Sequence, residues 1–357
     1  MGIRYDRDSR KATNGPIVFF SILKDEAFDE EITSAFYQGL SFYAYRFPHA
    51  SMMSYGSSEG YIEGIGVPGF IIGMFSPEKP IITIPYSGTK RGENSTSYYQ
   101  MPDVSTTYEE YSHEVDSIIK WLEGKPLDKV VAARVILREG RINLADQFFN
   151  LCQRFPDAFV FCFSTPATGC WIGASPELLL KGENGRLDSM ALAGTRPAGT
   201  PGVWDEKNKD EQKIVTDYIK ETFIKNGLTP KIGETYTKET GAIEHICTPI
   251  WSESILSDQK FSFLIKDLSP TPALCGYPKE NALKEIGRLE HFDRGCYGGF
   301  CGPFHSFGDF HFNVVVRCGS VNEKSLCIYT GGGITYRSSI KEEWEETALK
   351  AENTFGK

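Results

Sequence analysis

Long apolar runs are absent from this sequence, and positively charged residues are in short supply. No run approaches the roughly 20 apolar residues that a bilayer-spanning helix needs, so we expect no membrane span. The polar start, MGIRYDRDSRKATNG, lacks the apolar core of a signal peptide, so we expect a cytoplasmic protein. Lysine and arginine number 38 against 47 aspartates and glutamates, which argues against binding to nucleic acid or to an anionic membrane surface. An anionic substrate would therefore need local positive charge, from a divalent metal or from a few basic side chains.

Regular cysteine spacing, repeats and linkers are also missing. The nine cysteines form no CxxC pair, and no paired histidines follow Cys296 and Cys301 at zinc spacing, so we expect reduced, mostly buried thiols. No internal repeat and no Pro/Gly/Ser-rich linker divides the 357 residues. We therefore expect one large α+β domain over residues 1–357, with weaker signals in residues 1–110.

Apolar runs and alternation predict strands, and helical periodicity predicts helices. Strands are expected at residues 17–20, 41–47, 70–75, 81–84, 129–137, 158–163, 170–172, 178–180, 189–193, 310–318 and 325–329. Helices are expected at residues 108–124, 144–154, 205–225, 279–289 and 340–353. A turn at residues 183–185 predicts a hairpin, and the polar residues 88–103 are expected to form a long loop.

The C-terminal stretch TGGGITYRSSIKEEWEETALK combines glycines, carboxylates and an ammonium group. We expect a turn at glycines 331–333, whose N–H groups would be open to a ligand. In the helix that follows, Glu343, Glu346 and Lys350 are spaced i, i+3 and i+7, so they share one face. Such a face could hold a hard cation and an anion side by side. The alternative is an ordinary solvated helix face in an acidic protein.

Three upstream motifs contain single polar residues that a cavity could use. Glu177, in GASPELLL, follows a Ser-Pro pair, and partial burial would raise its pKa and suit it to act as an acid. In ALAGTRPAG, Gly194 allows close approach of a ligand and Thr195 can bind oxygen. Lys129 opens an apolar strand, and in a dry pocket it could work as a general base. The alternatives are a surface glutamate, an ordinary turn and an exposed lysine.

Four more residues are candidates because of their surroundings. Glu211 lies in an expected helix, where a solvated position is the alternative. His245 lies in GAIEHICTPI, where a packed core histidine is an equal alternative to a catalytic one. Arg317 ends an apolar run and needs an anion partner if it is buried. Tyr297 has glycine neighbours that leave its hydroxyl accessible.

In this order, the motifs resemble the chorismate-utilising enzymes: isochorismate synthases, salicylate synthases, and the large subunits of anthranilate and aminodeoxychorismate synthases. The resemblance covers roughly residues 125–355, whereas residues 1–110 match only loosely. The matching motifs are KVVAAR at 129, GASPELL at 173, ALAGTRPAG at 191, Lys207 with Asn208 and Glu211, His245, LSPTPALCG at 268, RGCYGGFCG at 294, Arg317, GGGI at 331 and EWEETALK at 343.

The resemblance implies a fold, a cofactor and a set of site residues. The implied fold is a single α+β domain in which two large sheets pack on each other with helices outside. The implied cofactor is Mg²⁺, held by Glu211 and Glu346 with Glu343 as a third or water-mediated ligand, and it would bind a substrate carboxylate. The implied catalytic residues are Lys129, Glu177 and His245. The implied substrate-binding residues are Gly194, Thr195, Tyr297, Arg317, Gly331, Gly332, Gly333 and Lys350.

Within the family, Lys129 and the ALAGT sequence resemble the isochorismate synthases of menaquinone and siderophore biosynthesis. In that branch, Lys129 would deprotonate a water that attacks ring carbon C2 of chorismate, and Glu177 would protonate the leaving C4 hydroxyl. Salicylate synthase, which goes on to eliminate pyruvate, stays open as an alternative. Anthranilate or aminodeoxychorismate synthase, and a non-catalytic chorismate-binding protein, are less favoured. We expect a monomer without an obligate glutaminase subunit. Ser269 and Asn208 depart from the family pattern, which often has a histidine and an acid there.

Overall fold

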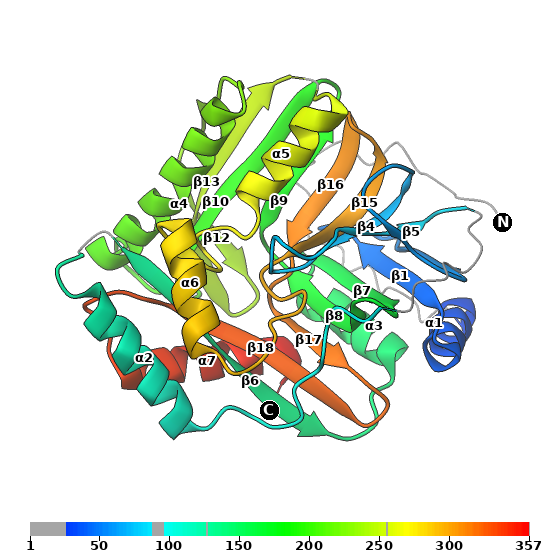
Figure 1. Ribbon diagram of the computed structural model, residues 1–357, viewed down its shortest axis with the longest axis horizontal. Coiled ribbons are helices and arrows are strands. Elements are labelled where there is room, and N and C mark those ends of the chain that lie inside the picture. Colours follow the sequence, from blue (N-terminus) through cyan, green and yellow to red (C-terminus); the bar gives the residue numbers. More distant parts are fainter. Residues whose placement is uncertain (1–25, 88–95, 126–127, 255, 357) are drawn as a thin grey trace.

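The computed structural model describes residues 26–87, 96–125, 128–254 and 256–356, and these ranges form two large antiparallel β-sheets (Figure 1). The eight-stranded sheet consists of β1 (Ser41–Arg46), β2 (Ser54–Ser58), β6 (Lys129–Glu139), β7 (Phe159–Thr165), β8 (Gly169–Ser175), β14 (Gly276–Tyr277), β17 (Cys318–Val321) and β18 (Ser325–Ile334). Its strand order is β14-β6-β18-β17-β8-β7-β1-β2.

The ten-stranded sheet combines strands that lie between residues 62 and 314. It consists of β3 (Ile62–Glu63), β4 (Gly69–Gly73), β5 (Ile82–Pro85), β9 (Leu178–Glu183), β10 (Arg186–Pro197), β11 (Lys231–Ile232), β12 (Tyr236–Thr240), β13 (Ile243–Glu253), β15 (Phe300–Ser306) and β16 (Asp309–Val314). Its strand order is β11-β13-β10-β9-β16-β15-β4-β5-β3, and β12 pairs with β13.

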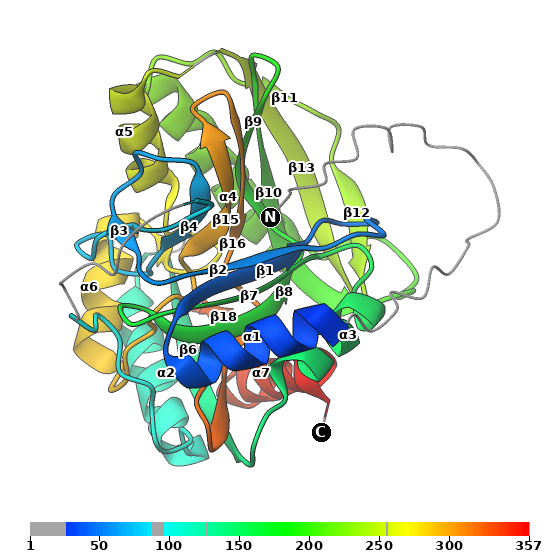
Figure 2. The same cartoon turned by 90° about the vertical axis from the view of Figure 1, so that its right-hand side faces the viewer.

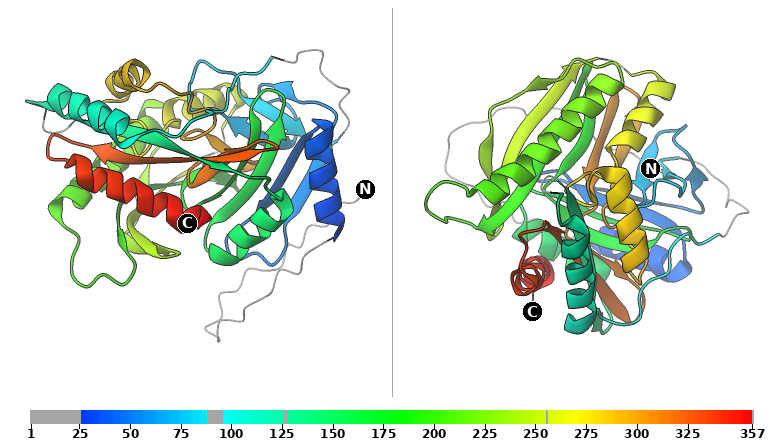
Figure 3. Two further views of the ribbon diagram at one scale, coloured as in Figure 1. Left: turned by 90° about the horizontal axis from the view of Figure 1, so that it is seen from below. Right: turned by 60° about the vertical axis from the view of Figure 1, so that its left-hand side comes forward.

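Helices cover the outer faces of both sheets. They are α1 (Glu26–Gln38), α2 (Tyr108–Leu122), α3 (Leu144–Arg154), α4 (Glu206–Lys225), α5 (Asp258–Leu268), α6 (Lys279–Leu289) and α7 (Ile340–Phe355). Helix α4 packs on β10 and β13, whereas α1 and α3 pack on β1, β7 and β8 (Figure 2). Helix α7 runs along β18, and α2 and α6 pack beside β6 (Figure 3). Among the described residues, none of the helices combines the length and apolar character that crossing a bilayer requires.

Strand β7 contributes side chains to two hydrophobic cores, one on each face of the sheet. Its residues alternate between the two faces of the sheet. Phe159, Phe161 and Phe163 belong to the central core between the sheets, whereas Val160 and Cys162 belong to the core beneath α1 and α3. Both faces of the strand are therefore apolar, which explains why this segment reads as a continuous apolar run.

Much of the predicted architecture is confirmed. The two packed sheets with helices outside are present, and the five predicted helices form with ends shifted by at most two residues. The hairpin at residues 183–185 joins β9 to β10. The sequence patterns did not predict α1, α5, β13 or β15. The predicted strand at residues 17–20 and part of the predicted loop, residues 88–95, lie outside the described residues.

Two predictions were wrong. The glycines at 331–333 do not form a turn, because they lie inside β18 and pair with Ala133, Ala132 and Val131 of β6. Residues 310–318 are not one strand, because β16 belongs to one sheet and β17 to the other. The chain crosses between the sheets at Arg317, whose backbone has φ 50, a left-handed conformation that few non-glycine residues adopt. The apolar run therefore continues through a change of sheet that its pattern does not reveal.

Candidate active site

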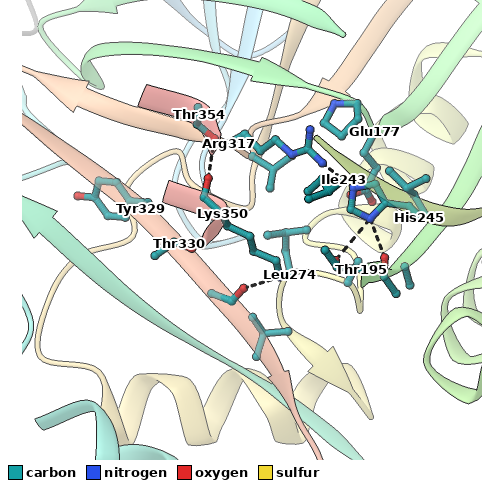
Figure 4. A pocket seen from close by; sticks show the side chains of 18 of the residues that line it. Glu177, Thr195, Ile243, His245, Leu274, Arg317, Tyr329, Thr330, Lys350 and Thr354 are labelled. Atoms are coloured by element: carbon teal, nitrogen blue, oxygen red, sulfur yellow. Dashed lines mark hydrogen bonds between the residues drawn. The ribbon is translucent and has the colours of Figure 1, made fainter. Parts of the chain in front are cut away.

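A cavity of about 100 Å³ lies between the two sheets, bounded by β10 and β13, by β6 and β18, and by the inner face of α7 (Figure 4). The structure brings many of the predicted residues to its wall: Glu177, Gly194, Thr195, Glu211, His245, Tyr297, Arg317, Gly331 and Lys350. The other predicted residues, Lys129, Gly332, Gly333, Glu343 and Glu346, do not line this cavity. They adjoin the residues that line it, through the contacts described below.

Glu177 is held at the turn between β8 and β9 with its carboxyl group inside the protein. Its backbone carbonyl accepts hydrogen bonds from Val314 N–H and from the Asn313 side-chain amide, both at 3.0 Å. The Thr271 hydroxyl donates to the carboxyl at 3.3 Å. Burial raises the pKa of Glu177 to about 8, although the hydrogen bond from Thr271 and the charges of nearby lysines oppose the shift. Glu177 is therefore largely protonated at neutral pH and can donate a proton.

Lys129 begins β6 and forms a buried ion pair with Glu211 of α4. Its side chain is only 1% exposed, and its Nζ lies 2.5 Å from Glu211 Oε1. Gly333 of β18 makes room for this pair, because a Cβ there would run into the Lys129 side chain and lie 2.9 Å from Glu211 Oε1. The glycine run is therefore a strand whose missing side chains leave space for charged groups.

Two more lysine–glutamate pairs adjoin the same strand. Lys350 Nζ lies 2.8 Å from Glu346 and donates to the Gly331 carbonyl at 3.0 Å. Burial lowers the pKa of Lys350, but the carboxylates around it, Glu346 first, outweigh burial and raise it. Lys207 Nζ lies 3.3 Å from Glu343, whose pKa is raised by burial. Three ammonium groups thus face the three carboxylates that were predicted as metal ligands.

The donor chemistry of these three carboxylates fits Mg²⁺, which prefers carboxylate oxygen ligands. Glu211, Glu343 and Glu346 each have a lysine partner in this structure, and the pKa of Glu346 is held below its usual value because Lys350 outweighs the effect of burial. In the ranges that the structure describes, no three His, Cys, Asp or Glu side chains are already gathered around a common point as metal ligands. The residue types for a magnesium site are present, and their ion pairs would have to rearrange around the ion.

His245 and Arg317 form a buried pair at the wall of the cavity (Figure 4). His245 Nδ1 lies 2.6 Å from the Gly194 carbonyl, so Nδ1 carries the proton and donates. Nε2 then accepts from Arg317 at 2.5 Å. Burial and the Arg317 charge lower the pKa of His245 to about 3, so the ring is neutral. These bonds favour a role in positioning Arg317, and the catalytic role of His245 stays a prediction.

Arg317 is a buried cation that lacks a carboxylate partner among the described residues. Its side chain is 8% exposed, and it donates hydrogen bonds to His245 and to the Thr240 carbonyl, the latter at 3.5 Å. Burial lowers the pKa of Arg317 to about 10, which still leaves the guanidinium charged at neutral pH. A buried guanidinium of this kind has the charge and geometry to bind an anion that enters the cavity.

Asn208 explains how the Gly194-Thr195 corner is built. Its side-chain oxygen accepts from Thr195 N–H at 3.3 Å, while its amide nitrogen donates to Asp205 at 2.7 Å. Gly194 has φ +71, and a Cβ there would lie 2.9 Å from the Asn208 oxygen. A carboxylate at position 208 would face Asp205 with like charge, so the departure from the family pattern suits this local arrangement.

Sequence reasoning assigned no role to three residues that act on this site, although Lys207 and Thr271 lie in motifs that carry the resemblance. Lys207 lies four residues before Glu211, which was a usable helical signal, but no partner was predicted for it. Lys238 donates to the Pro176 carbonyl at 2.8 Å, beside Glu177. Thr271 donates to Glu177 itself. Nothing in the local sequence links Lys238 or Thr271 to a residue so distant in the chain.

Comparison with known proteins gives consistent results. A family model described as chorismate binding enzyme matches residues 85–355. The isochorismate synthase EntC of Escherichia coli strain K12 is 31% identical over 248 residues, covering 64% of this chain and 63% of that protein. The vibriobactin-specific isochorismate synthase of Vibrio cholerae serotype O1 is 30% identical over 263 residues, covering 69% of this chain and 66% of that protein. The matches thus span a little under two thirds of each relative's length.

A solved structure shares the fold over nearly the whole chain. MenF, the menaquinone-specific isochorismate synthase of Escherichia coli, superimposes with a TM-score of 0.75 and covers 94% of this chain and 92% of its own. Its sequence identity is 19%, so this likeness concerns the fold alone.

Proposed function

This chain belongs to the chorismate binding enzymes, and from that premise we propose that it converts chorismate to isochorismate with Mg²⁺ as cofactor. The observation that carries the proposal is Glu177, a buried carboxyl group with a pKa of about 8 in the same cavity as Arg317. A proton donor and an anion-binding cation in one cavity suit the removal of a hydroxyl group from an anionic substrate. The identity of about 30% to two isochorismate synthases supports the choice of reaction.

Substrate binding is assigned to the polar groups on the cavity wall. Arg317 binds one carboxylate of chorismate by charge-assisted hydrogen bonds, and Tyr297 lines the same cavity with its hydroxyl group beside Gly331. Glu211, Glu343 and Glu346 would hold Mg²⁺, which supplies positive charge for a second carboxylate when it is bound. Arg317 and Mg²⁺ would thus supply the local positive charge that an anionic substrate needs in this acidic protein.

The proton transfers are assigned to Lys129 and Glu177. Neutral Lys129 takes a proton from a water molecule, whose oxygen forms the new bond to ring carbon C2. The ring double bonds shift, the C4–O bond breaks, and Glu177 gives its proton to the departing hydroxyl group, which leaves as water. One water enters and one leaves, so the reaction is an isomerisation. Lys129 acts only in its neutral form, so its ion pair with Glu211 must loosen in the substrate complex.

The test is to incubate purified protein with chorismate and Mg²⁺, with and without ammonium, and to identify products by chromatography and mass. We expect isochorismate in both samples. Salicylate with pyruvate would instead identify the eliminating activity. An amino product that appears only with ammonium would contradict the role given to Lys129. No turnover in any sample, with and without EDTA, would favour a binding protein.

A further inference from the structure

A second cavity, of about 770 Å³, lies outside the site described above. It is enclosed by residues 100–106, by α2, by the end of α6 and by residues 291–293, beside β6. Figure 1 shows α2 and α6 near β6 on this side of the molecule. The two cavities share no lining residue. The volume is within the range that small-molecule sites usually have, roughly 300–1,000 Å³.

The wall of this cavity is partly apolar and carries an excess of negative charge. Its apolar part includes Met101, Val135, Leu289 and Phe292. Its acidic side chains are Asp103, Glu109, Glu110, Glu114 and Asp293, against one arginine, Arg288, and two histidines, His113 and His291. Most of these charges are exposed and screened by solvent, so the excess alone does not define a site.

Several of these charged groups already have partners. Arg288 pairs with Glu285 at 2.7 Å, and Asp293 pairs with Lys79 at 2.7 Å. Glu110 accepts from Thr107 N–H at 2.7 Å in the cap of α2. A positively charged ligand would therefore have to find its partner elsewhere on the wall.

Glu114 differs from the other acidic residues of the wall because its carboxyl group is both buried and, within the described part of the chain, without a hydrogen-bond donor. Its side chain is only 8% exposed and lines the cavity, and no donor among the described residues hydrogen-bonds to its carboxyl group. Arg294, whose charge acts on Glu114, is ion-paired with Glu290, which accepts from Arg294 Nε at 2.7 Å and from Ala133 N–H at 3.2 Å. Burial and the Glu290 charge raise the pKa of Glu114 to about 8. At neutral pH the Glu114 carboxyl group is therefore largely protonated in the empty cavity, and a bound cation would supply the counter-charge that favours its ionised form, with release of the proton.

We propose that this cavity binds an organic monocation, an ammonium group on an apolar body, with Glu114 as its counterion. The apolar wall accommodates the body of the ligand, and Glu114 forms a charge-assisted hydrogen bond to its ammonium group. A bare divalent ion fits less well, because one unpartnered carboxylate supplies few of the oxygen ligands it needs. The inference does not depend on the reaction proposed above, since no residue of the central cavity takes part.

Binding of phenethylammonium to the purified full-length protein tests the inference, measured by calorimetry and by the thermal midpoint Tm. The matched ligand is 2-phenylethanol, which has the same ring and no charge. We expect saturable binding of phenethylammonium at least about tenfold tighter than that of 2-phenylethanol, the difference expected for one charge-assisted hydrogen bond. Hydrogen exchange should be slowed in α2 and α6 by the cation.

Protein variants locate the binding. Glu114→Gln keeps the shape of the side chain and should weaken binding of phenethylammonium about tenfold or more, while Glu123→Gln, an exposed position after α2, should leave it unchanged. If Glu114→Gln does not fold, Glu114→Asp, with a shorter carboxylate, should bind with intermediate affinity. No saturable binding, equal affinity for the cation and the alcohol, or wild-type affinity in the Glu114 variant that folds would overturn the inference. Production of isochorismate is a separate measurement, so either proposal can fail alone.

Discussion

Replacing Glu177 by glutamine should affect activity and stability in opposite directions. The carboxamide keeps the shape of the side chain but cannot supply a proton to the leaving hydroxyl group. We expect turnover to fall by about 10²–10⁴-fold, the usual contribution of a general acid. In the wild-type enzyme, turnover should also decline as the pH rises through about 8, because Glu177 is then ionised.

The stability effect follows from the same pKa. The pKa of Glu177 rises from 4.5 to about 8 on folding, so the folded state holds a proton that the unfolded state has lost between these values. Below the lower value both states are protonated and there is no difference. As the pH rises through this window, the wild-type free energy of unfolding falls by about 1.4 kcal/mol per pH unit. By pH 7 the loss is on the order of 3 kcal/mol, and the glutamine variant does not suffer it.

Guanidinium unfolding of both proteins between about pH 5 and pH 8 measures this difference. Glu114 and His245 also titrate anomalously, but they are present in both proteins and cancel in the comparison. The variant should gain stability relative to wild type as the pH rises. A difference that stays constant over this range, or a variant whose turnover is within a few-fold of wild type, would refute the reasoning about Glu177.

Four further predictions concern the charged groups around β18. Lys129→Ala should lower turnover by about 10²–10⁴-fold with little change in KM, which steady-state kinetics would measure. EDTA should abolish turnover and added Mg²⁺ should restore it. Glu346→Gln should raise the Mg²⁺ concentration needed for half-maximal rate, whereas Glu342→Gln, on the exposed side of α7, should not. Gly333→Ala should destabilise the fold by about 1–3 kcal/mol and lower turnover, because the added Cβ would strike Lys129. The control is Gly308→Ala, whose Cβ meets open space. It should change neither the free energy of unfolding nor the rate in the same assays.

The sequence predicted elements well where the pattern is local. Helices such as α3 and α6 have strong periodicity and clear ends, and their bounds are the predicted ones. The turn predicted at glycines 331–333 was wrong because glycine usually marks a turn. Here its lack of a Cβ makes room for Lys129 and Glu343 beside a strand. The single strand predicted at residues 310–318 was wrong because an apolar run does not indicate which sheet each half joins.

The site shows the same division. Residue types and their order in the chain were enough to nominate Glu177, Arg317 and the three glutamates, because each motif is short and its resemblance is local. The contacts that decide their chemistry join distant segments. Thr271 binds Glu177 across 94 residues, and Lys129 pairs with Glu211 across 82.

By itself, the sequence determined the family resemblance, most of the helices and the residue types available for chemistry. Only the tertiary structure decided the protonation states and the ion-pair partners of the site residues. Glu177 is protonated because the packed sheets remove it from water, and His245 is neutral because burial and Arg317 oppose its charge. Each predicted metal carboxylate faces a lysine because α4, α7, β6 and β18 converge. Burial and through-space charge are properties of the folded arrangement, and no local sequence pattern encodes them.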